Sequence, residues 1–87
     1  MKIVFAGTPQ SAVPSLDALC SAGYSPLAVL TQPDRRQGRG RHLVPSAVAV
    51  RAEELGIPLL KPEKASDPVF QDRWTSLAPD LLVVVAY

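Results

Sequence analysis

The residues best suited to bind a charged ligand are four arginines in one short segment. They are Arg35, Arg36, Arg39 and Arg41, which fall within seven residues that contain no acid. Planar guanidinium groups match the paired oxygens of a phosphate, so this segment is suited to grip a nucleic-acid backbone. Gly38 and Gly40 flank Arg39 and let the backbone approach a ligand closely, and His42 extends the positive segment. A solvated surface loop is the alternative, because runs of charge are usually solvated.

A second candidate is the turn Gly7-Thr8-Pro9, which follows a short apolar run. It could leave N–H groups free to face an anion at a helix start, or it could be a plain turn. No G-x-G-x-x-G dinucleotide motif follows that run. Gly38-Arg39-Gly40 does not supply one either, because the sixth position is Leu43.

Residues that catalyse reactions or bind metals are scarce. His42 is the one histidine, and no partner group stands near it in the sequence, while Cys20, the one cysteine, falls on the apolar face of a predicted helix. A metal site needs several ligands, and a general base needs a partner, so we predict no metal site and no catalytic residue in these 87 residues. We expect Cys20 and Trp74 to pack in the core.

Composition places the chain among globular proteins. With 47% hydrophobic residues and a net charge of +1, it lacks the signature of disorder, and its total charge does not indicate nucleic-acid binding. No apolar run approaches the roughly 18–20 residues of a membrane span, and residues 1–6 are too short for a signal-peptide core. The single cysteine favours a reducing compartment, so we expect a cytoplasmic protein without a membrane partner.

The chain alternates between strand and helix patterns. Apolar, β-branched runs predict four strands, at residues 2–6, 27–30, 57–60 and 81–86. Pro58 suits an edge strand. The last run has no alternation, which is typical of a strand buried on both faces. Residues 32–44 show no apolar period and are predicted to be a loop.

Three helices are predicted between these strands. The first begins with Ser11 as N-cap and ends at Gly23. The second helix begins with Pro45 and Ser46, and its stripe of apolar residues starts at Val44. The third has Asp67 as N-cap and Pro68 at its first position. Its apolar face consists of Val69, Phe70, Trp74 and Leu77.

The order β-α-β-α-β-α-β predicts an α/β fold with a Rossmann-like parallel sheet and helices on both faces. Ligands of such sheets bind beyond the carboxyl ends of the strands, which makes Gly7, Thr8, Pro9 and Tyr87 the expected rim of an active site. Because the chain stops after its most hydrophobic strand, we expect a fold incomplete at its C-terminal side. In this chain that strand should be an exposed edge and a site of self-association.

Four strings of this sequence together resemble the methionyl-tRNA formyltransferases. They are FAGTP (residues 5–9), TQPDR-x-x-GRGR (residues 31–41), LVPS (residues 43–46) and VVVAY (residues 83–87). The second string is the most specific. The resemblance runs from Lys2 to Tyr87 and implies that residues 1–87 are the N-terminal part of a Rossmann-like catalytic domain, with a C-terminal β-barrel domain absent here.

The resemblance also implies an activity. This family transfers the formyl group of 10-formyltetrahydrofolate to the amino group of methionine on initiator tRNA. Its loop after the second strand enters the tRNA acceptor end, and its key arginine corresponds to Arg39, so the expected partner is RNA and not DNA. The family's catalytic residues, and most of its folate pocket, correspond to positions beyond Tyr87. We therefore expect residues 1–87 alone to be inactive.

One departure from the family and two other functions stay open. Gln10 and Ser11 stand where many relatives have an acid followed by Phe. The chain could instead belong to a formyl-folate transferase with a small-molecule acceptor, which needs no arginine-rich insertion. It could also be a non-enzymatic RNA-binding Rossmann module.

Overall fold

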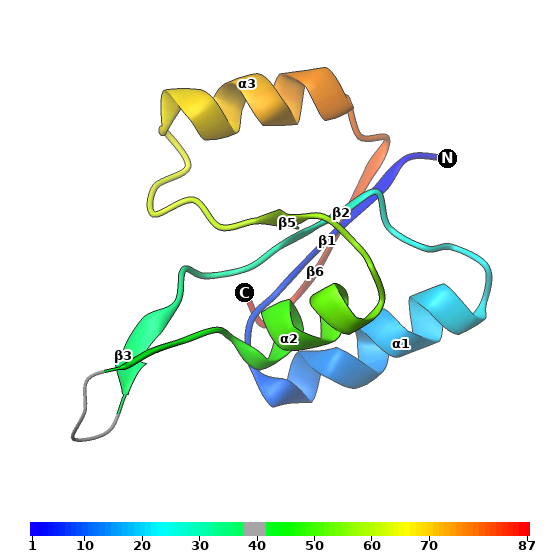
Figure 1. Cartoon of the computed structure of the whole chain (residues 1–87). Coiled ribbons are helices and arrows are strands. Elements are labelled where there is room, and N and C mark those ends of the chain that lie inside the picture. Colours follow the sequence, from blue (N-terminus) through cyan, green and yellow to red (C-terminus); the bar gives the residue numbers. More distant parts are fainter. Residues whose placement is uncertain (38–41) are drawn as a thin grey trace.

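The protein forms a parallel β-sheet flanked by helices. A computed structural model describes residues 1–37 and 42–87 (Figure 1). The sheet has the order β5-β2-β1-β6, and all three strand pairs are parallel. Its strands are β1 (Ile3–Gly7), β2 (Ala28–Leu30), β5 (Leu59–Leu60) and β6 (Leu81–Val85). The predicted α/β, Rossmann-like fold is confirmed, and the edge position predicted from Pro58 is correct for β5.

β1 lies at the centre of the sheet and is buried along its whole length. It begins and ends one residue later than predicted. Lys2 lies just before the strand, where its N–H donates to the Asp80 carboxylate at 2.8 Å. Gly7 belongs to the strand because it pairs with Val85. A Cβ at Gly7 would lie 2.8 Å from the Val85 carbonyl oxygen, and 3.0 Å from atoms of Ala12 and Phe5, so only glycine fits there.

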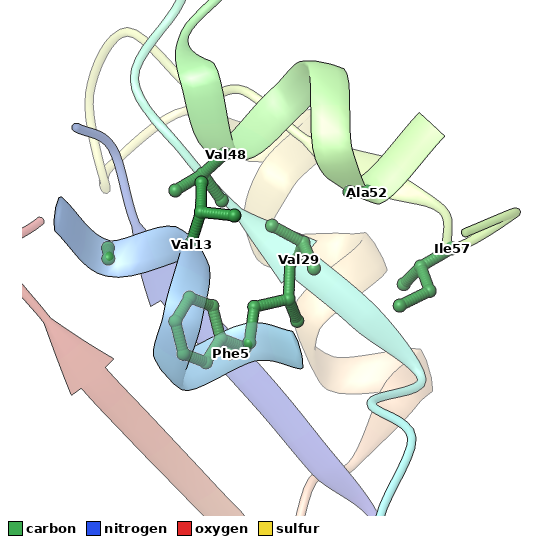
Figure 2. Packing of buried hydrophobic residues seen from close by; sticks show 8 residues of the cluster. Phe5, Val13, Val29, Val48, Ala52 and Ile57 are labelled. Atoms are coloured by element: carbon green, nitrogen blue, oxygen red, sulfur yellow. The ribbon is translucent and has the colours of Figure 1, made fainter. Parts of the chain in front are cut away.

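Two helices cover one face of the sheet (Figure 1). A 3₁₀ turn at Gln10–Ala12 leads into α1 (Val13–Ser21), and α2 (Ala47–Glu54) packs beside α1. Figure 2 shows side chains from the sheet and both helices converging in the core between them. The fully or nearly fully buried members are Phe5, Ala12, Val13, Leu16, Val29, Val48, Ala52 and Ile57. Cys20 is partly buried against this core, as predicted.

The predicted helix starts are partly wrong on this face. Ser11 does not cap α1, because the 3₁₀ turn after Pro9 carries the chain into the helix and Ala12 takes the N-cap position without a side-chain hydrogen bond. Ser46 does cap α2, and its hydroxyl accepts from the Ala49 N–H at 3.0 Å. Val44 is exposed in a strand of its own and not part of the α2 stripe.

One helix, α3 (Pro68–Leu77), lies over the opposite face (Figure 1). As predicted, Asp67 is its N-cap and accepts from the Val69 N–H at 2.9 Å. None of its residues is buried, however, and Val69 is 69% exposed. The predicted core position of Trp74 is therefore wrong. Its ring lies 5.9 Å from the ring of Phe70, and both are only partly covered.

β6 is an edge strand with a large exposed apolar surface. It pairs with β1 along one side, and no described strand pairs with its other side. Leu81, Leu82 and Val84 are 45%, 42% and 59% exposed. Burial on both faces, as the sequence pattern suggested, is therefore not found, whereas the exposed edge expected for this chain is confirmed.

The predicted loop of residues 32–44 contains a second, two-stranded sheet. β3 (Arg35–Gln37) and β4 (His42–Val44) form an antiparallel hairpin. The prediction failed because Arg35, Arg36 and all of β4 are exposed, and the two strands carry no alternating apolar pattern to reveal them. Among residues 1–37 and 42–87, no helix is of a length and apolarity suited to crossing a membrane.

Candidate functional site

The carboxyl edge of the sheet is organised around Thr8, which follows β1. Its hydroxyl donates to the Tyr87 carbonyl oxygen at 3.1 Å and accepts from the Gln32 N–H at 3.3 Å. Its carbonyl oxygen accepts from the Val48 N–H at 3.3 Å. One residue thus joins the chain segments that leave β1, β2 and β6, together with the first turn of α2.

A hollow of about 380 Å³ opens at this edge. Its walls are the segments after β1 and β2 and the start of α2, including Thr8, Pro9 and Gln32. Of the described residues that line it, Arg35 alone carries a charge. Ligands of open parallel sheets bind at this edge, so the hollow is placed where the fold provides a site.

The β3–β4 hairpin projects from the same edge, away from the sheet (Figure 1). Arg35 pairs with Val44, and Arg36 pairs with Leu43. Arg35, Arg36 and His42 are exposed. Gly38, Arg39, Gly40 and Arg41 lie outside the described residues. The described part of the predicted basic segment therefore presents two arginines and a histidine to solvent beside the hollow.

The expected rim residues have different surroundings. Thr8 and Tyr87 are in contact, and Pro9 lines the hollow. Gly7 lies deeper, within β1, where the structure shows it making room for Val85, Ala12 and Phe5. Gln10 and Ser11 are exposed in the 3₁₀ turn.

Four polar residues at the root of the hairpin escaped prediction. The hydroxyl oxygens of Thr31 and Ser46 lie 2.6 Å apart, and Lys61 Nζ lies 2.7 Å from Asp34 Oδ1. The sequence offered one signal, the N-cap position of Ser46. The contacts join segments distant in sequence, so local patterns do not reveal them.

The described side chains at this edge offer the hydroxyls of Thr8 and Ser46, the Gln32 amide and the Arg35 guanidinium. Within residues 1–37 and 42–87, no three His, Cys, Asp or Glu side chains cluster as metal ligands. Among the described residues, the guanidinium of Arg51 has a shifted pKa. The Asp17 carboxylate and then Glu54, both hydrogen-bonded to Arg51, raise the pKa of Arg51 above its ordinary value. That group ties α2 to α1 and lies outside the hollow.

Comparison with known proteins identifies relatives for the whole chain. A methionyl-tRNA formyltransferase of Thermobifida fusca (strain YX) is 59% identical over 87 residues, and one of Streptomyces coelicolor is 58% identical over 88. One of Synechococcus sp. (strain CC9605) is 52% identical over 88 residues. The chain is similar, from end to end, to one segment of the methionyl-tRNA formyltransferases.

The segment is a limited part of these formyltransferases. Each match includes 100% of the chain but only 26–28% of the relative's length. A scan against models of known protein families finds no match. The resemblance read from the four strings is thus confirmed, and it covers about a quarter of each formyltransferase.

Proposed function

We propose that this chain is the N-terminal part of the catalytic domain of a cytoplasmic enzyme that formylates methionyl initiator tRNA. The observation that carries the proposal is the 51–59% identity, along the whole chain, to proteins named methionyl-tRNA formyltransferase. The exposed arginines beside a hollow at the carboxyl edge of the sheet give further support.

In the proposed reaction, 10-formyltetrahydrofolate is the formyl donor and a co-substrate. The amine nitrogen of the methionyl group bonds to the formyl carbon, the bond from that carbon to the folate nitrogen breaks, and the amine proton passes to the leaving nitrogen. We assign no described residue to the folate and none to proton transfer. The role of this chain is to hold the acceptor end of the tRNA.

The hairpin can hold RNA through its charge and its geometry. Arg35 and Arg36 extend from β3, and phosphate contacts by such groups weaken as salt rises, in proportion to their number. We propose that Arg39, between two glycines, makes a bidentate contact that positions the acceptor end. The other arginines then contribute mainly charge.

A chimera tests the function directly. In the Thermobifida fusca relative, the matching segment is replaced by this chain, and formylation of methionyl-tRNA is measured. We expect activity comparable to that of the relative, because the exchanged segment is 59% identical. A folded chimera that binds the tRNA without formylating it would contradict the proposal and favour a non-enzymatic RNA-binding module.

Two arginine variants of the chimera test the RNA contact. Arg39→Lys keeps the charge but removes the bidentate fork, so we expect a loss of about 2–3 kcal/mol in transition-state stabilisation on tRNA. Arg36→Lys is the matched control and should be close to neutral at two salt concentrations. Equal, small effects would remove the specific role of Arg39. Activity on a small formyl acceptor, insensitive to Arg39→Lys, would favour the small-molecule alternative.

A further inference from the structure

The hairpin is tied to the body of the protein at its root. The chain enters β3 through residues 31–34 and leaves β4 through residues 45–46. Thr31, which is fully buried, follows β2, and its hydroxyl oxygen lies 2.6 Å from that of Ser46. Its N–H also donates to the Leu60 carbonyl oxygen at 3.0 Å. These contacts fix the point from which the hairpin projects.

A second tie at the root is the ion pair between Asp34 and Lys61. Asp34 stands directly before Arg35, the first residue of β3, and Lys61 stands directly after Leu60, the last residue of β5. Lys61 Nζ lies 2.7 Å from Asp34 Oδ1, and the two side chains are 30% and 33% exposed. The ion pair therefore joins the start of the hairpin to the far edge of the main sheet.

Contacts of the hairpin with two different parts of the body, α2 and β5, restrict the angle at which it projects from the sheet. With only the contacts of Thr31, Ser46 and Gln32, the hairpin could swing about the backbone between Gln32 and Arg35. Pro33 limits that motion by fixing its own φ, and the Asp34–Lys61 contact removes more of it. Partly exposed ion pairs add little to folding stability. The geometry of this pair is thus better suited to aiming the hairpin than to holding the fold together.

We propose that Asp34 and Lys61 are positioning residues that set the angle of the β3–β4 hairpin, and so place Arg35 and Arg36 against the phosphates of the RNA acceptor. The RNA part of this inference rests on the function proposed above. The aiming of the hairpin does not depend on it. Two experiments separate these parts.

The first experiment measures the hairpin itself in the 87-residue chain. Spin labels are placed on Leu43→Cys in β4 and Glu53→Cys in α2, in a Cys20→Ser background. For the parent chain we expect one narrow distribution of the distance between the two labels. Lys61→Ala should make that distribution at least twofold broader. Lys64→Ala, at an exposed lysine three residues away, is the matched control and should leave the width unchanged. Equal widths in both variants would overturn the proposal.

The second experiment uses the chimera and separates binding of tRNA from general damage. Lys61→Ala should raise the KM for methionyl-tRNA about fivefold while leaving kcat and the KM for the formyl donor within twofold. Lys61→Arg should stay within twofold of the parent, because it keeps the ion pair. The exchange Asp34→Lys with Lys61→Asp should recover part of the loss seen with Lys61→Asp alone.

Three outcomes would contradict positioning of RNA. The first is an unchanged KM for tRNA in Lys61→Ala. The second is an equal rise in the KM values for tRNA and for the formyl donor. The third is a KM for tRNA in the double variant Asp34→Lys with Lys61→Asp that is no better than in Lys61→Asp alone. An inactive parent chimera would instead count against the proposed function, and the spin-label distances would still decide whether the pair aims the hairpin.

Discussion

The helices on the two faces of the sheet differ sharply in how deeply they are buried. Under α1 and α2, Phe5, Leu16 and Val48 are fully buried and interlock with the sheet. Over the other face, α3 has no buried residue, and a hollow of about 380 Å³ separates it from Leu27, Ala28 and Pro58. The same amphipathic signal in the sequence thus accompanies very different amounts of burial, because burial depends on what lies opposite the helix.

The largest expected difference between the faces comes from removing a ring on each. Phe5→Ala should lower the free energy of unfolding by about 3–5 kcal/mol, because it empties a fully buried site. Phe70→Ala on α3 should cost about 1 kcal/mol, because its ring is only partly buried. Urea unfolding of the dilute 87-residue chain measures both. Similar losses would mean that α3 packs as firmly as α1 and α2.

The N-cap residues of α2 and α3, on opposite faces of the sheet, should differ in how much stability they contribute. Ser46→Ala should cost about 2–3 kcal/mol, since it removes the cap of α2 and leaves the buried Thr31 hydroxyl without its partner. Asp67→Ala removes only the cap of α3 and should cost about 1 kcal/mol. Thermal unfolding followed by circular dichroism ranks the two. The reverse order would contradict the linking role of Ser46.

Close packing around Gly7 gives a smaller effect. Gly7→Ala should cost about 2 kcal/mol, because its Cβ would press on the Val85 carbonyl, Ala12 and Phe5. Gly23→Ala is the control, since its Cβ has open space and meets only the strain of φ +88°, worth about 1 kcal/mol. If urea unfolding shows the two losses to be equal, the atoms around Gly7 yield to the added Cβ more readily than the contact distances suggest.

The smallest expected change in fold stability is at the exposed edge. The 87-residue chain should self-associate through β6, and Val84→Lys should shift it toward monomer with little effect on unfolding. Val69→Lys changes an apolar residue of α3 that is 69% exposed, and it should leave association unchanged. Sedimentation at several concentrations measures this. A wild-type chain that stays monomeric throughout would refute the idea.

Local signals predicted most of the elements. Gly23 ends α1 with positive φ, and the pair Asp67-Pro68 starts α3, because these residue types act on their own backbone. The parallel sheet with helices on both faces also followed from the alternation of elements and the handedness of their crossovers.

Features that depend on distant neighbours were not predictable. Trp74 has helical spacing with Phe70, which does not reveal that its ring is only partly buried. The candidate site shows the same limit. Arg35 and Arg36 were recognised from their type, whereas the Asp34–Lys61 pair exists only because β5 lies beside β2.

The central place of β1 has a consequence for the order of folding. The contact of Lys2 with Asp80 spans 78 residues, whereas that of Thr8 with Gln32 spans 24. Closing the longer loop costs about 1 kcal/mol more in chain entropy. We therefore expect β1, α1 and β2 to assemble first and β6 to join last. Amide hydrogens of β6 should then exchange through a partial opening that leaves those of β2 protected.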